Sequence, residues 1–94
     1  MNLDAFEQSL QQNAPPGELD KALQALWYEA KGDWEAAHQA AQAQDDEAGA
    51  WVHAYLHRVE GDEGNAGYWY RRARKPHATS DVKIEWREIA AALL

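Results

Sequence analysis

A helical run broken by a glycine and an acidic residue limits most strongly what this chain can fold into. From Ala50 to Glu60, apolar side chains recur at helical spacing and show no strand-like alternation. Gly61 and Asp62 follow, a pair that combines a left-handed helix stop with a helix N-cap. A second helical run then extends to about Arg74. This stretch predicts two helices joined by a tight turn.

The same punctuation occurs earlier in the chain, where Gly32 and Asp33 separate two further helical runs. Breaks at residues 13–17 and at Lys75-Pro76 set off one helix at each terminus, and no hairpin-type turn or alternating run indicates a strand. Short connections between helices favour antiparallel neighbours. We therefore predict an all-α antiparallel array of helical hairpins with about six helices. Its parts are an N-terminal helix (1–14), a first hairpin (18–44), a second hairpin (47–76) and a C-terminal capping helix (79–94).

Size and charge limit the class of protein. The chain has 94 residues, enough for a single domain (1–94) with a modest core. It lacks cysteine, which excludes a disulfide framework and thiol chemistry. We expect no membrane span, and the net charge of −7 argues against binding nucleic acid or anionic membranes. The expectation is a cytoplasmic protein of bacterial type.

Two segments of the chain align through their turns. When Gly32 is placed above Gly61, Ala25, Asp33 and Ala37 fall above the equivalent residues of the second hairpin, Ala54, Asp62 and Ala66. This pattern of glycine, acidic and small residues over positions 18–76 resembles two degenerate repeats of the tetratricopeptide (TPR) family. The copies are 29 residues apart, whereas the family period is 34, and the proline that ends a repeat appears only at Pro76. The resemblance implies a scaffold that holds a peptide or protein partner in a concave groove.

The resemblance also implies which residues would line that groove. At the family's groove positions this sequence has Trp51, Tyr55 and Arg58, which share one helix face by their i, i+4, i+7 spacing. Two aromatic rings and a guanidinium are a common recognition set. The alternative interpretation is that Trp51 and Tyr55 complete a small core.

A set of histidines suggests a polar pocket in the second hairpin. His53, His57 and Glu60 point the same way from one helix, at positions that the family fills partly with apolar residues. His38 and Tyr70 lie on neighbouring helices and could join them. Two histidines one turn apart, with a carboxylate, make His53, His57 and Glu60 metal-ligand candidates. The alternative is a set of packed imidazoles that hydrogen-bond to nearby tyrosine or glutamate side chains.

No recognised catalytic motif surrounds these residues, so the sequence favours a non-enzymatic protein without a cofactor. The expected function is a protein–protein interaction module that binds a peptide or protein on an aromatic and arginine face. The alternative is a metal-binding or acid/base enzyme centred on His53, His57 and Glu60.

The basic residues are concentrated in the second half of the chain. Residues 1–49 hold ten acids and two bases, whereas residues 50–94 hold six acids and seven bases. Four of those bases form a run: Arg71, Arg72, Arg74 and Lys75. The run predicts either complementation of a helix dipole or a patch that faces an anion.

The last helix carries more apolar residues than one face needs. Val82, Trp86, Ile89 and Leu93 share a stripe, and Ile84 and Leu94 lie outside it. Such a helix can cap the open end of a helical array and still present apolar side chains to a second copy. We therefore expect a homo-oligomer that forms through the C-terminal helix.

Overall fold

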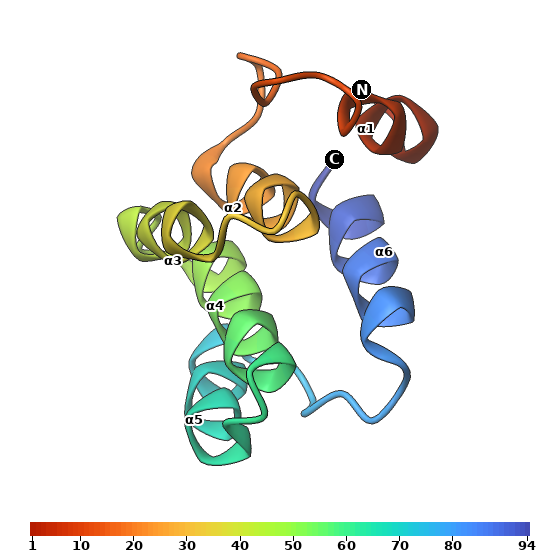
Figure 1. Cartoon of the computed structure of the whole chain (residues 1–94). Helices are drawn as coiled ribbons and strands as arrows, with labels where there is room; N and C mark the ends of the chain where they lie inside the picture. The colour runs from red at the N-terminus through yellow and green to blue at the C-terminus, as the bar shows by residue number, and fades with distance from the viewer.

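The computed structural model describes residues 1–94 and contains six α helices and no strand (Figure 1), which confirms the all-α prediction. The helices are α1 (Leu3–Ser9), α2 (Lys21–Ala30), α3 (Trp34–Ala43), α4 (Glu47–Val59), α5 (Glu63–Ala73) and α6 (Val82–Leu93). None of them has the length and apolar character needed to cross a membrane.

Every helix begins at an asparagine or aspartate whose side chain accepts a backbone N–H from the first turn. The caps at Asp33 and Asp62 are the predicted ones. The predicted start of the second helix near Glu18 is wrong, because Asp20 accepts the Leu23 N–H at 3.0 Å and α2 begins after it. The N-terminal helix is also shorter than predicted, since regular helix stops at Ser9.

The turns after α2 and α4 require glycine. Gly32 and Gly61 have φ angles of 81° and 85°, in the left-handed region that side chains with a Cβ rarely adopt. Arg74 takes the same conformation after α5, at a φ of 58°, although it is not a glycine. The chain thus turns back sharply after α2 and α4, and it leaves α5 through a less favourable turn.

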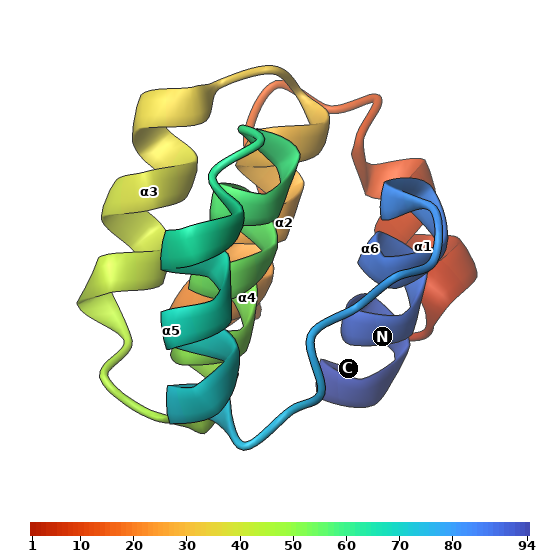
Figure 2. The same ribbon diagram turned by 90° about the horizontal axis from the view of Figure 1, so that it is seen from below.

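The helices form two hairpins with a third layer beside them. α2 packs on α3, α4 packs on α5, and the hairpins meet through α2, α3 and α4. α6 lies across α2 and α4, on the side turned away from α3 and α5, and α1 contacts α6 from outside (Figures 1 and 2). The C-terminal helix therefore covers the inner face of the hairpins.

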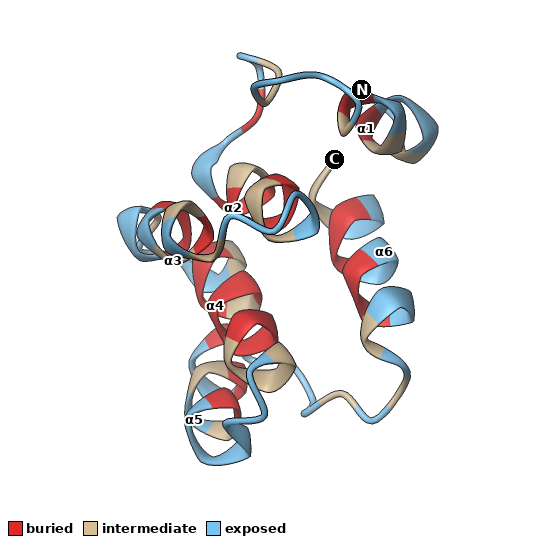
Figure 3. Cartoon of the chain, in the orientation of Figure 1, coloured by how far each residue is buried: buried red, intermediate tan, exposed pale blue.

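The main core lies between α6 and the α2–α4 layer, where buried residues from several helices face one another (Figure 3). Trp86 stacks on Phe6 with ring centroids 5.4 Å apart, and its indole N–H donates to the Leu26 carbonyl at 3.1 Å. The large buried side chains include Trp27, Leu56, Tyr70 and Trp86. Trp34 and Trp69 are only half-buried, because they lie on the outer helices α3 and α5, which no further layer covers.

Candidate functional site: two polar clusters on α4

Helix α4 carries two groups of polar side chains on opposite sides. Successive residues rotate by about 100° around a helix, so the side of His53 and His57 is far from that of Tyr55 and Arg58. The first side forms the histidine cluster: His38, His53, His57, Glu60 and Trp69. The second forms the arginine–glutamate network: Arg58, Tyr70, Ser80 and Glu85. Each cluster joins α4 to different neighbours.

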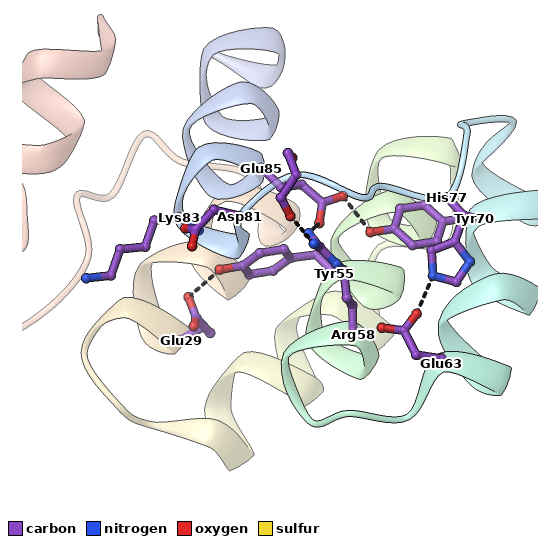
Figure 4. Close-up of polar contacts among 10 residues, drawn as sticks. Glu29, Tyr55, Arg58, Glu63, Tyr70, His77, Asp81, Lys83 and Glu85 are labelled. Atoms are coloured by element: carbon purple, nitrogen blue, oxygen red, sulfur yellow. Dashed lines mark hydrogen bonds and ion pairs between the residues drawn. The ribbon is translucent and has the colours of Figure 1, made fainter.

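The arginine–glutamate network ties α6 and the segment before it to the second hairpin (Figure 4). Arg58 Nη1 donates to Glu85 Oε1 at 2.8 Å, and the Tyr70 hydroxyl donates to Glu85 Oε2 at 2.5 Å. The other terminal nitrogen of Arg58 donates to the Ser80 carbonyl. Glu85 is only 2% exposed, and each of its carboxylate oxygens accepts a hydrogen bond. The network satisfies a buried charge completely.

Two members of the predicted groove of Trp51, Tyr55 and Arg58 are covered by α6. Tyr55 is 2% exposed, and its hydroxyl makes a long hydrogen bond of 3.5 Å to Glu29. Burial raises the pKa of Tyr55 far above its usual range, and burial also raises the pKa of the Glu29 carboxyl. Arg58 is engaged by Glu85. These side chains are covered because α6 occupies the face from which they project.

Trp51, the third member of the predicted groove, is half-buried against the core. The Lys75 ammonium lies 4.4 Å from the centroid of its ring. The structure therefore separates Trp51 from the arginine–glutamate network.

The histidine cluster gathers four of the five residues expected in the polar pocket. His38 Nε2 lies 3.0 Å from Glu60 Oε1, and the His38 ring centroid is 5.9 Å from that of His57. The His53 ring lies between two flat neighbours, with centroids 4.9 Å from His57 and 3.9 Å from Trp69. The expected fifth member, Tyr70, lies outside this cluster, because it faces α6 and its hydroxyl donates a hydrogen bond to Glu85.

Burial controls the charge of His53. Removal of His53 from water is the largest cause that lowers its pKa, and positive charge on His57, His38 and Arg72 acts in the same direction, so that together they bring it from 6.5 to about 4. The Nδ1 atoms of His53 and His57 are buried and have no hydrogen-bond partner. The nearest carboxylate oxygens to His57 Nδ1 are 3.8 Å and 3.9 Å away, which is too far for a hydrogen bond. His53 is thus held neutral.

The cluster does not form a metal centre. The His53 and His57 rings are stacked with only 11° between their planes, so their nitrogens lie side by side and do not converge on one point. No group of three histidine, aspartate or glutamate side chains in the structure is arranged to hold a metal ion. The metal-ligand interpretation of His53, His57 and Glu60 therefore has no support in this geometry.

The predicted anion patch is largely occupied by groups of the chain itself. Arg72 lies 3.7 Å from Asp45, Arg74 lies 3.4 Å from Glu47, and Lys75 covers the Trp51 ring. Arg71 is exposed and forms no ion pair. Three of the four cations are engaged by different partners, so the run does not form one open anion-binding surface.

Sequence reasoning missed Glu85. This residue lies on the apolar stripe of the last helix, directly before Trp86 and one turn before Ile89. A carboxylate in such a stripe is the signal that could have found it, because a buried acid needs a buried partner.

A further surface is the α5 face, formed by Tyr68, Trp69 and Arg72, of which the sequence predicts only Arg72 as a candidate, as part of the anion patch. Tyr68 is 46% exposed, and the Arg72 guanidinium lies 4.9 Å from the Trp69 ring centroid and 5.9 Å from that of Tyr68. A pocket of about 240 Å³ adjoins this face, lined in part by Asp45, Asp46, Glu47 and His53.

Comparison with protein-family models, curated proteins and solved structures gave no match to this chain.

Proposed function

We propose that this chain is a protein–protein interaction module that binds a peptide or protein partner through the α5 face. One observation carries the proposal: Tyr68 is among the few large hydrophobic side chains that are exposed, and Arg72 stacks beside it and Trp69. Tyrosine, tryptophan and arginine are the residues that most often dominate binding energy at protein interfaces. The aromatic and arginine face expected from the sequence is thus assigned to α5 instead of the covered inner side of α4.

The α5 face is ordered by contacts within the chain. Trp69 packs on His53, its ring lies edge-on to Tyr68 at 5.3 Å, and Arg72 is placed by both Trp69 and Asp45. Binding of a partner here costs little conformational entropy, because the positions of these side chains are already restricted. This pre-organisation supports a recognition role, and a tetratricopeptide-like display of a hairpin surface to a partner belongs to the same proposal.

The test is affinity capture from native lysate followed by binding measurements with each captured protein in purified form. We expect Tyr68→Ser and Arg72→Ala to weaken binding of a true partner by at least about tenfold, the effect of losing one interface hot spot. Ile84→Ser is the matched control, because Ile84 is also exposed, at 52%, but lies on α6.

Circular dichroism should confirm that all three variants keep their helices. The proposal fails if Tyr68→Ser and Arg72→Ala capture the same proteins as the wild type with unchanged affinity. It also fails if Ile84→Ser weakens binding as much as they do.

A further inference from the structure

We propose that α6 also docks on the α2–α4 face of a second copy of this chain, so that two copies form a dimer by exchanging their C-terminal helices. This surface is separate from the α5 face, and the inference does not depend on the proposed function. A second copy fits as the occupant because the face already accepts a helix that carries Glu85, Trp86 and Ile89.

Each contact that fixes α6 to the body of the molecule joins a group on α6 to a group on α2, α4 or α5. Glu85 accepts hydrogen bonds from Arg58 and Tyr70, and the Trp86 indole N–H donates to the Leu26 carbonyl. A second copy brings an identical α6, so every one of these contacts can form again between chains. Exchange of an identical element is a low-cost route to a dimer for this reason.

The exchanged helix must be free to leave its own body, and the segment of residues 74–81 allows this. It begins at Arg74, whose left-handed φ of 58° is unfavourable for a residue with a side chain and would relax in a straightened connection. From residue 77 to residue 81, no backbone N–H donates to a backbone carbonyl. The segment is instead held by side chains, such as the exposed His77 that pairs with Glu63 (Figure 4).

The segment is also long enough to reach a second copy. Eight residues extend to about 26 Å when the chain is straight. The molecule measures 33 × 24 × 21 Å along its principal axes, so a straightened segment spans its middle dimension. An exchanged α6 can therefore reach the same face of a neighbouring copy without disturbing either helical hairpin.

Complementary charge reversal tests the exchange. Arg58→Glu and Glu85→Arg each place like charges together within one chain and so loosen its own α6. In a mixed dimer, each body meets an α6 of the opposite charge: one pair is native and the other is reversed. We expect the two variants to be predominantly monomeric alone and to form a one-to-one heterodimer after they are unfolded and refolded together, as measured by light scattering and native mass spectrometry.

The double variant Arg58→Glu/Glu85→Arg is the matched control, since it restores an opposite-charge pair within one chain. If the single variants are unfolded when alone, co-refolding should restore their helicity. Mixtures that remain monomeric, or remain unfolded, while the double variant folds would overturn the proposal.

The wild type gives a second measurement that needs no substitution. Isotopically heavy and light copies, refolded together at rising concentration, should give a dimer of mixed mass whose fraction grows with concentration. Releasing the segment with His77→Ala should increase that fraction. Monomers at every concentration, for both proteins, would remove the exchanged dimer.

Discussion

The arginine–glutamate network and the histidine cluster occupy opposite sides of α4 and handle burial in opposite ways. In the network, Arg58 and Tyr70 pair with both oxygens of a fully buried carboxylate. In the histidine cluster, two buried Nδ1 atoms have no partner, and the rings gain aromatic contact with one another and with Trp69. A charge is thus tolerated in this protein where it is completely paired, and a polar ring where it stays neutral and stacks.

The difference follows from where the partners come from. Glu85 is supplied by α6, 27 residues beyond Arg58, so the network closes only when α6 is in place. The histidines lie on adjacent helices, and their stacking needs no residue from α1 or α6. We expect the network to control attachment of α6, and the histidine cluster to control how stability responds to pH.

The largest effect should come from breaking the network on one side only. Arg58→Met leaves Glu85 buried without its cation, a change that costs about 3–5 kcal/mol in comparable buried pairs. We expect a loss of about that size in the free energy of unfolding, measured by urea denaturation. Arg87→Met is the control: Arg87 also pairs with a glutamate, at 3.1 Å, but is 56% exposed, so its loss should cost less than about 1 kcal/mol. Equal, small losses in both variants would show that the network is no stronger than a surface ion pair.

A smaller effect, confined to acid, should come from the histidine cluster. The pKa of His53 is about 4 in the folded chain and near 6.5 when unfolded, so between these values the unfolded chain binds more protons. Stability from neutral His53 is therefore fully present above about pH 6.5 and is lost as pH falls toward 4, by up to about 3 kcal/mol. His53→Leu should abolish this component, measured as the difference from wild type in the free energy of unfolding across pH.

The groups that face His53 make the control important. His38 and His57 are its histidine neighbours, and Trp69 stacks on it. Arg72 raises the positive potential around His53, and Glu60 lies beside His38 and His57. His77→Gln changes the one histidine outside this cluster, which pairs with Glu63, and shows how much of the wild-type slope that pair contributes. If His53→Leu keeps the wild-type slope, the pH response belongs to other groups.

The smallest effect we expect is that of divalent metal. Because His53 and His57 stack, the change in Tm on adding Zn²⁺ or Ni²⁺ at pH 7.5 should be no larger for the wild type than for His57→Ala. A rise in Tm that disappears in His57→Ala would mean that the rings turn edge-on and share an ion. The contrast between a stacked cluster and a paired network would then no longer hold.

The sequence by itself determined the local structure of this protein. Gly32 and Gly61 mark the left-handed turns, and Asp33, Asp46 and Asp62 mark helix starts, because caps and turns depend on residues only a few positions apart. Helical spacing also placed His53, His57 and Glu60 on one side of α4, and these residues do lie together. Those parts of the fold and of the histidine cluster follow from one-dimensional pattern.

Tertiary structure alone decided that α6 covers the Tyr55 side of α4. Spacing put Tyr55 and Arg58 on one face but could not say that α6 would cover it, since the covering helix joins through a connection without regular structure. Burial of Glu85 is tolerated because Arg58 and Tyr70 donate hydrogen bonds to it. Tyr70 lies apart from the histidine cluster because its hydroxyl is bound to Glu85. The free energy of a buried charge depends on partners brought together from distant positions, and that information lies in the packing of α6 on α4.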